Sequence, residues 1–307
     1  MEICMFYFGV LLLMSSYLSL TSSTSHFNLT TDQYALTILK NSFVSDPNAI
    51  LHKNWSIHTP ICGWIGVSCG IKHQRVTALN LSSFELQGTI PLHLGNLTFL
   101  RVLDISSNSF TGVLPSELSK LRRLELINVA ANNFTGEIPP WFGALSQLRH
   151  VDLNNNSFSG RIPSSLFNIS RLQSLNMSLN LLDGSIPNNI CNITSRLREF
   201  NAYKNQLEGE IPRNIGKCKE LEVLQLQNNS FNGDIPSEIG SLSMLKILYL
   251  GENEFKGGIP EQFGNLTSLR VLHLGYNHLT GGISKQVGNL TSLIKLVLAD
   301  NHFTGMC

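Results

Sequence analysis

The chain has 307 residues, a formal net charge of +1 and only 14% charged residues. This near-neutral balance gives no basic face for a nucleic acid or an anionic membrane, so neither partner is expected. A chain of this length ordinarily suggests two domains. A sequence repeat of fixed period overrides that expectation here, because stacked repeats have no single core to outgrow.

The N-terminal segment is apolar from Ile3 to Leu20 and is followed by small serines. This pattern predicts a secretory signal peptide over residues 1–25. Glu2 stands where Lys or Arg is usual, so an N-terminal membrane anchor is the alternative interpretation. No other apolar run is long enough to span a bilayer.

Residues 26–75 are predicted to form a cap in front of the repeats. An amphipathic helix is expected from Thr31 to Phe43, capped by Thr30 or Thr31, and Asp46-Pro47 ends it. The apolar face of this helix consists of Ala35, Leu36, Leu39 and Phe43. Two tryptophans, Trp55 and Trp64, are expected in the core of the cap. The cap would cover the apolar edge of the first repeat.

Residues 76–307 repeat the phrase L-x-x-L-x-L-x-x-N-x-x-x-G-x-I-P, in nine full repeats and an incomplete tenth. Full repeats have 24 residues, except the fifth, which has 25. They start at Val76, Leu100, Leu124, Leu148, Leu172, Leu197, Leu221, Leu245 and Leu269, and the tenth starts at Leu293. Apolar residues in the first, fourth and sixth places predict one core-facing strand per repeat. Stacking then places these strands in a parallel sheet with a spacing of roughly 4.8 Å.

The ninth place is asparagine in nine repeats. A buried amide there can satisfy main-chain groups that the turning chain leaves unpaired, so a structural role is predicted. The residues are Asn108, Asn132, Asn156, Asn180, Asn205, Asn229, Asn253, Asn277 and Asn301. Glycine in the thirteenth place permits a tight turn, and the Ile-Pro that usually follows ends strand pairing.

The segment GTIPLHLGNLTFLRVLDISSNSFTG, from Gly88 to Gly112, resembles the plant-specific leucine-rich repeat of receptor-like kinases of the immune-receptor type. The resemblance covers roughly residues 30–307. It implies an α/β repeat fold, a right-handed solenoid with a parallel sheet on its concave face and a second short strand at L-x-G-x-I-P. It also implies a helical N-terminal cap closed by a disulfide between Cys62 and Cys69.

The chain stops inside the tenth repeat, where the family continues into further repeats, a membrane helix and a kinase. An apolar edge at Leu293, Leu296 and Leu298 is expected to lack a covering repeat. A receptor fragment or a truncated product is therefore expected.

Twelve N-x-S/T sequons occur, which together with the signal peptide predict secretion and N-linked glycans. They are Asn28, Asn54, Asn80, Asn96, Asn133, Asn155, Asn168, Asn176, Asn192, Asn228, Asn265 and Asn289. Five of them are expected on the convex side: Asn96, Asn168, Asn192, Asn265 and Asn289. Cys191 and Cys218 also fall on the convex side of consecutive repeats. A bridge between them is one alternative, but two buried thiols are the favoured interpretation.

No catalytic motif and no cluster with metal-ligand spacing occurs, so no enzymatic activity, metal or cofactor is expected. His150 and Asp152 lie two residues apart on one strand face, but no nucleophile accompanies them. A surface pair is the favoured interpretation of these two residues.

The variable places on the predicted sheet face become larger from the sixth repeat onward. Aromatic residues with a polar tip bind well at low entropy cost, so a peptide groove is the hypothesis. Its residues are Tyr203, Lys204, Gln225, Gln227, Tyr249, Glu252, His273 and Tyr276. The competing interpretation is that tyrosine suits exposed strands in general.

The resemblance implies an extracellular recognition module that binds a peptide or protein ligand, or a pathogen-derived one, and pairs with a co-receptor kinase ectodomain. Its location would be the plasma membrane as part of a full receptor, and otherwise the extracellular apoplast. Two alternatives remain: a secreted protein similar to plant polygalacturonase inhibitors, and a truncated non-functional receptor copy.

Overall fold

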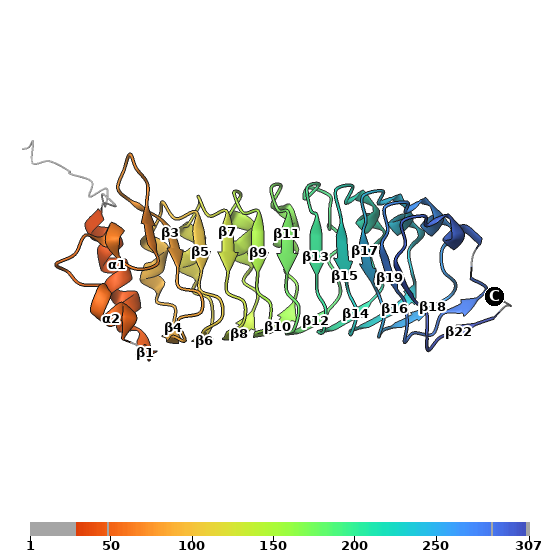
Figure 1. Cartoon of the computed structure of the whole chain (residues 1–307), viewed down its shortest axis with the longest axis horizontal. Coiled ribbons are helices and arrows are strands. Elements are labelled where there is room, and N and C mark those ends of the chain that lie inside the picture. The colour runs from red at the N-terminus through yellow and green to blue at the C-terminus, as the bar shows by residue number, and fades with distance from the viewer. Residues whose placement is uncertain (1–28, 48, 284, 305–307) are drawn as a thin grey trace, which may run out of the picture.

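The computed structural model describes residues 29–47, 49–283 and 285–304 of the chain. The predicted signal peptide and the sequon at Asn28 therefore lie outside the described residues. The described part is an elongated solenoid, with the helical cap at one end and the tenth repeat at the other (Figure 1).

The cap contains two short helices and two strands that join it to the first repeat. Its elements are α1 (Leu29–Asn41), β1 (Phe43–Ser45), α2 (Ile50–Asn54), the 3₁₀ helix η1 (Ile61–Gly63) and β2 (Val67–Cys69). Trp55 and Trp64 are buried and stack with ring centroids 5.2 Å apart. A disulfide joins Cys62 and Cys69.

The predicted extension of the first helix to Phe43 is wrong, because α1 ends at Asn41. Phe43 instead begins β1, which pairs antiparallel with β4 (Gln87–Thr89) of the first repeat. The Ser42 hydroxyl stabilises the turn from α1 into β1, where it lies within hydrogen-bond distance of the Leu39 carbonyl (2.6 Å) and the Thr89 carbonyl (2.9 Å). Pairing with a distant strand thus overrides the local helical pattern at the end of this helix.

The principal sheet contains one strand from each of the ten repeats, with β2 added antiparallel at the cap. In the described chain its other strands are β3 (Val76–Asn80), β5 (Val102–Asp104), β7 (Leu126–Asn128), β9 (His150–Asp152), β11 (Ser174–Asn176), β13 (Glu199–Asn201), β15 (Val223–Gln225), β17 (Ile247–Tyr249), β19 (Val271–His273) and β21 (Lys295–Val297). Neighbouring repeat strands are parallel, and equivalent places of each repeat face one another. Leu103, for example, pairs with Leu79 and Ile127. This constant register aligns each place of the repeat in a row along the solenoid.

A second sheet follows the L-x-G-x-I-P segments, as the resemblance implied. Beyond β1 and β4 it contains β6 (Ser109–Gly112), β8 (Asn133–Glu137), β10 (Ser157–Arg161), β12 (Leu181–Gly184), β14 (Gln206–Gly209), β16 (Ser230–Asp234) and β18 (Glu254–Lys256), while β20 (Thr280–Gly281) pairs with β22 (His302–Phe303). Thirteenth-place glycines from Gly112 to Gly281 have φ between 67° and 83°, a backbone conformation that residues with a side chain rarely adopt.

Short 3₁₀ helices close most repeats on the side opposite the principal sheet. They are η2 (Leu92–Asn96), η3 (Ser116–Lys120), η4 (Pro140–Ala144), η5 (Ser164–Asn168), η6 (Arg213–Lys217), η7 (Ser237–Ser241), η8 (Glu261–Asn265) and η9 (Lys285–Asn289). A single continuous core fills the space between them and the two sheets. Phe110, Phe134 and Phe158 stack within it at ring-centroid distances of 6.3 and 6.2 Å.

The ninth-place asparagines lie at the turn between the two sheets. Asn132 is typical: its amide donates to the carbonyls of Ile105, Val129 and Ala130 at 3.0–3.1 Å. Its side-chain oxygen accepts from the Phe110 N–H at 2.9 Å. Each amide therefore connects two consecutive repeats through main-chain groups.

The fifth repeat departs from the pattern on its convex side, where a turn replaces the 3₁₀ helix. Here the favoured prediction of two free thiols is wrong, because Cys191 and Cys218 form a disulfide. The stacking of consecutive repeats brings their Cα atoms to 5.2 Å, within the range that a disulfide spans. Both cysteines are buried.

Candidate functional site

Three of the rows of side chains on the concave face of the principal sheet are named here by their place in the repeat. Row five ends each strand, row seven follows it, and row eight lies at the turn. The strand register carries row five across β13, β15, β17 and β19 as Asn201, Gln225, Tyr249 and His273. Row eight has a left-handed backbone throughout, with φ of 52–60°.

In the first five repeats this face carries mostly short side chains, and several of its polar groups bond to one another. The Asn128 amide donates to Asp104 at 3.4 Å, and the Ser178 hydroxyl donates to Asn154 at 2.8 Å. Burial raises the pKa of the Asp152 carboxyl, although the Asn154 main-chain N–H and the Asn176 amide donate to it and oppose the rise.

His150 and Asp152 lie at opposite ends of β9, and His150 is exposed. The Asp152 carboxylate accepts from the Asn154 N–H at 3.0 Å.

In the later repeats the face carries larger side chains on adjacent strands. The rings of Tyr249 and His273 are in contact, with centroids 5.7 Å apart and planes at 39°. Gln225 precedes Tyr249 in the same row. These three half-buried side chains form a continuous surface across β15, β17 and β19.

The other predicted residues lie along the adjacent rows. Tyr203 and Gln227 occupy row seven of repeats six and seven and are half-buried. Lys204, Glu252 and Tyr276 occupy row eight and are exposed, with Tyr276 at 56%. The structure therefore places the eight predicted residues on one face, although Tyr203 and Tyr276 lie at opposite ends of the group.

His273 is the most constrained residue of this group. Its ring lies against Gly251, where an added Cβ would overlap the imidazole. Its Nδ1 atom is buried and has no hydrogen-bond partner in the described chain, and the same holds for Gln227 Oε1. Burial lowers the pKa of the His273 imidazole, and the Lys295 ammonium lowers it further.

Sequence reasoning considered Asn228 only as a sequon and missed Gly251, Gly275 and Lys295, which also shape this surface. Asn228 donates to the exposed Glu252 carboxylate at 2.6 Å and so connects two repeats along row eight. The two glycines of row seven leave room for the row-five side chains of the next repeat. Reading row seven along the repeats would have found the two glycines, because the row changes from Ser, Ala, Asn, Tyr and Gln to Gly in the eighth and ninth repeats.

The five sequons expected on the convex side lie at or near its helices and turns. Asn96, Asn168, Asn265 and Asn289 each end a 3₁₀ helix, and Asn192 lies in the turn of the fifth repeat. These places are on the opposite side of the repeat from the three rows.

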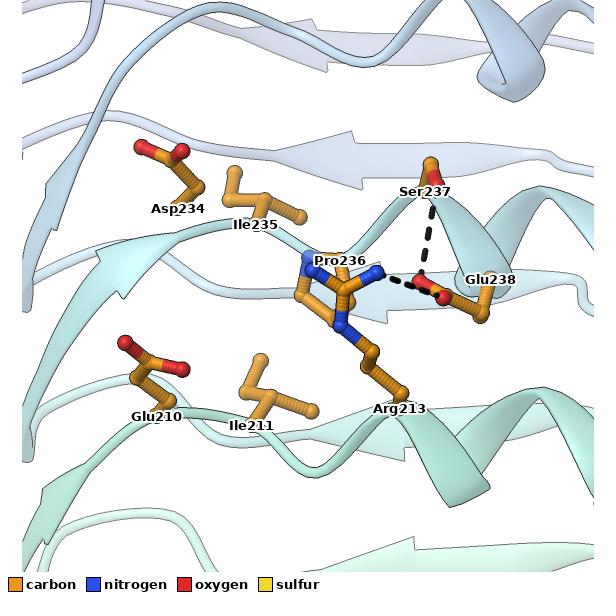
Figure 2. Close-up of a pocket in the computed structure, with 8 residues that line it drawn as sticks. All are labelled: Glu210, Ile211, Arg213, Asp234, Ile235, Pro236, Ser237 and Glu238. Carbon is orange, nitrogen blue, oxygen red and sulfur yellow. Dashed lines mark hydrogen bonds and ion pairs between the residues drawn. The ribbon is translucent and has the colours of Figure 1, made fainter.

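The flank beside the second sheet has shallow hollows between repeats. One of about 300 Å³ separates repeats six and seven. There Arg213 pairs with Glu238 at 3.1 Å, while the carboxylates of Glu210 and Asp234 point away from this pair (Figure 2). A similar hollow of about 490 Å³ recurs beside Glu137 and Arg161. Because the Ile-Pro turn produces such hollows repeatedly, they do not mark a distinct site.

Family models match three parts of the chain. Residues 29–70 match the "Leucine rich repeat N-terminal domain", residues 99–121, 123–145, 147–169 and 171–193 match the "Leucine Rich Repeat", and residues 188–304 match the "Leucine-rich repeat region". The chain belongs to the leucine-rich-repeat family.

Relatives of this leucine-rich-repeat protein include the LRR receptor-like serine/threonine-protein kinase EFR of Arabidopsis thaliana, which is 39% identical over 80 residues. That match covers 26% of the chain and 8% of the relative. The Arabidopsis thaliana GASSHO1/SCHENGEN3 ectodomain, in complex with CASPARIAN STRIP INTEGRITY FACTOR 2, has a TM-score of 0.87 and 34% identity. It matches 90% of the chain and 33% of that ectodomain chain.

The Arabidopsis receptor kinase HAESA, solved with the peptide hormone IDA and the co-receptor SERK1, has a TM-score of 0.73 and 31% identity over 90% of the chain. The chain spans half of that structure and much less of the curated receptor kinase. Within the described ranges, no helix combines the length and hydrophobicity that a membrane crossing requires.

Proposed function

We propose that this leucine-rich-repeat protein is the ligand-recognition part of a plant cell-surface receptor, and that it binds a peptide on the concave face of repeats six to nine. The ligand is an endogenous or pathogen-derived peptide. In this proposal the chain binds the ligand and catalyses no reaction. It enters the secretory pathway, carries N-linked glycans and acts outside the cell.

One observation carries the proposal: the polar network of the concave face gives way, after repeat six, to the contact surface formed by Gln225, Tyr249 and His273. Tyrosine and histidine rings bury a large area with few rotatable bonds, so they bind at low entropy cost. The Tyr249–His273 contact holds both rings in place before a ligand arrives.

The similar structures support a peptide ligand and a second receptor. HAESA was solved with a peptide hormone and a co-receptor. In this proposal the bound peptide brings a co-receptor kinase ectodomain to the same surface, and signalling follows from holding the two ectodomains together.

The test uses the secreted full chain and a displayed library of random twelve-residue peptides. A variant with Tyr203→Ala, Tyr249→Ala and Tyr276→Ala is compared with a control in which Thr135, Asn232 and Thr280, exposed on the second sheet, become alanine. Peptides enriched on the native chain should lose binding to the first variant and keep it on the second. Equal binding to both variants would reject the concave site.

A further inference from the structure

The charges of the chain are unevenly distributed between the two long edges of the solenoid. The strands of the principal sheet begin at one edge, and the second sheet forms the other (Figure 1). Eight of the eleven arginines lie at the first edge, either directly before a repeat or in its second place. These two positions are named here row zero and row two. The net charge of +1 hides this separation, so the expectation that the chain has no basic face is wrong for this edge.

The opposite edge is acidic. The strands of the second sheet contain five carboxylates, against one arginine and one lysine, Arg161 and Lys256. All five carboxylates are exposed, and they belong to Glu137, Asp183, Glu208, Asp234 and Glu254. Charges of opposite sign on opposite edges nearly cancel in the total, but they leave a strong local potential at each edge.

Six arginines of repeats two to six form what we name the basic edge, and all of them reach solvent. Arg149 is half-buried and the other five are exposed. Among the described residues, Glu125 and Glu220 are the two carboxylates within ion-pair distance of these guanidinium groups. The edge therefore has four more positive charges than it has paired carboxylates. Its members are Arg101, Arg149 and Arg198 in row two and Arg123, Arg171 and Arg196 in row zero.

The three row-zero arginines have no carboxylate partner among the described residues. The Arg123 guanidinium carbon lies 4.0 Å from the centre of the Phe99 ring, a contact that orders the side chain without neutralising its charge. The side chains of Arg171 and Arg196 make no hydrogen bond or ion pair with the described part of the chain. Because neighbouring like charges repel, their concentration along one exposed edge indicates an anionic partner.

The arginines alternate between the two rows along the edge. Row two has arginine in repeats two, four and six, and row zero has arginine directly before repeats three, five and six. The row-two main chains of consecutive repeats are hydrogen-bonded to one another, as the Arg149 N–H is to the Glu125 carbonyl at 2.8 Å. Consecutive repeats are therefore separated by about 4.8 Å, and row-two arginines by about 9.6 Å.

This spacing favours one conformation of an anionic chain. A polyproline-II helix has three residues per turn and rises about 3.1 Å per residue, so every third side chain points the same way at intervals of about 9.3 Å. An extended strand repeats at about 6.6 Å, so only every second arginine of row two would meet a carboxylate. Arginine suits this task because its planar fork binds a carboxylate through two parallel hydrogen bonds.

The shape of the edge favours a slender partner. The hairpin formed by β2 and β3 extends beyond the basic edge at the cap end of the solenoid (Figure 1). A single peptide segment can lie beside this hairpin, whereas the straight acidic edge of a second copy would meet the hairpin first. Charge complementarity and shape together therefore indicate an acidic segment.

We propose that the basic edge binds an acidic segment of a partner protein in the polyproline-II conformation, with a carboxylate at every third residue. The segment lies along the solenoid from repeat two to repeat six. Arg171 and Arg196 contribute strongly, because no carboxylate of the described chain competes for them. This surface lies on a different side of the solenoid from the concave peptide site, and neither proposal depends on the other.

The experiment compares two variants of the full chain that lose three positive charges from opposite edges. The basic-edge variant combines Arg171→Gln, Arg196→Gln and Arg198→Gln. The control variant combines Arg161→Gln, Arg213→Gln and Lys256→Gln on the side of the second sheet. All six side chains are exposed, so both variants should fold, and thermal unfolding verifies it.

The probe is a fluorescein-labelled peptide of four Glu-Pro-Pro units, whose carboxylates span about 28 Å. Its isomer has the same composition, with four consecutive glutamates between two blocks of four prolines. Fluorescence anisotropy should show that the native chain binds the spaced peptide more tightly than the isomer. The basic-edge variant should lose about tenfold in affinity, because three exposed charge pairs are removed, and the control should keep the native affinity. Raising NaCl from about 50 to about 300 mM should weaken native binding.

Each alternative has its own result. Equal affinity of the two variants would show a response to net charge alone and reject the basic edge. Equal affinity for the two peptides rejects the polyproline-II spacing. Displacement of the probe by polygalacturonate, at a lower carboxylate concentration than the unlabelled peptide needs, assigns the edge to an acidic polysaccharide and rejects a protein segment. Self-association of the native chain in sedimentation velocity that the basic-edge variant lacks assigns the edge to a second copy, which also rejects the proposal.

The concave site is tested separately from the basic edge. The triple-tyrosine variant should bind the Glu-Pro-Pro peptide as the native chain does, and the basic-edge variant should keep the peptides that were enriched on the concave face. Loss of the Glu-Pro-Pro peptide on the triple-tyrosine variant would place it in the concave site and reject the basic edge as its binding surface.

Discussion

Asp32 of the first helix and Arg75 at the start of the first repeat form a buried ion pair. The two carboxylate oxygens accept from Arg75 Nε and Nη2 at 2.8 and 2.7 Å. Asp32 also accepts from the Val76 N–H at 3.0 Å, and the guanidinium lies 4.5 Å from the centre of the Phe99 ring. This contact fixes the cap on the solenoid across 43 residues of sequence.

Asp32→Ala is expected to destabilise the chain by about 3–5 kcal/mol, because it leaves the buried Arg75 charge without its carboxylate. Urea unfolding of the full chain measures the change. Glu125→Ala, which breaks an exposed pair with Arg101, is the control and should cost at most about 1 kcal/mol. Equal losses in the two variants would contradict a structural role for the buried pair.

Asn108→Ala tests the asparagine row. The native amide donates to the carbonyls of Leu81, Ile105 and Ser106 and accepts from the Leu86 N–H. Removing it leaves several buried groups unpaired, at about 1–3 kcal/mol for each unsatisfied group. Ser109→Ala, at the exposed neighbouring position, should leave the urea midpoint nearly unchanged. An asparagine variant as stable as this control would refute the structural assignment.

Phe134 tests the stacked rings of the core. It is fully buried between Phe110 and Phe158. Phe134→Ala should cost about 3–5 kcal/mol through lost burial and the resulting cavity. Phe134→Leu should cost less than about 1.5 kcal/mol, because leucine fills the equivalent place at Leu182 and Leu207. Differential scanning calorimetry distinguishes the two, and the expectation fails if the leucine variant is the less stable.

The disulfide between Cys191 and Cys218 closes a loop with a sequence separation of 27 residues. In the chain-entropy account such a bond contributes about 3–4 kcal/mol, so the double alanine variant should unfold at a lower temperature. Alkylation of the denatured, unreduced chain followed by mass spectrometry should leave both cysteines unmodified. Modification of both would show free thiols and overturn the bridge.

His273 should make stability sensitive to mild acid. Its folded-state pKa is lowered from 6.5, first by burial and then by Lys295. Between that lowered pKa and 6.5 the unfolded chain binds more protons than the folded chain, so stability rises with pH through this window and is lost on acidification. His273→Gln should reduce this loss, whereas His150→Gln, at an exposed histidine, should retain it. Urea midpoints measured across pH 5–7.5 would show no difference if His273 were freely solvated.

The sequence was sufficient to predict most of the fold, because the same residue types recur in the same places of ten repeats. Leucines in the first, fourth and sixth places, the ninth-place asparagine and the thirteenth-place glycine each predicted an environment that the structure contains. The helix ending at Asn41 was mispredicted, since β1 depends on pairing with β4, more than forty residues further along the chain. The Cys191–Cys218 bridge was mispredicted because consecutive repeats set the distance between the cysteines.

For the candidate site, too, some properties follow from the sequence and others only from the tertiary structure. Sequence alone predicted that the eight large polar and aromatic residues share one face, because each row can be read from the period. Only the tertiary structure decided that Tyr249 and His273 are in contact and that Gly251 makes room for the imidazole. These properties depend on side-chain direction and hydrogen-bond geometry between neighbouring repeats, whereas the period determines only which residues share a row.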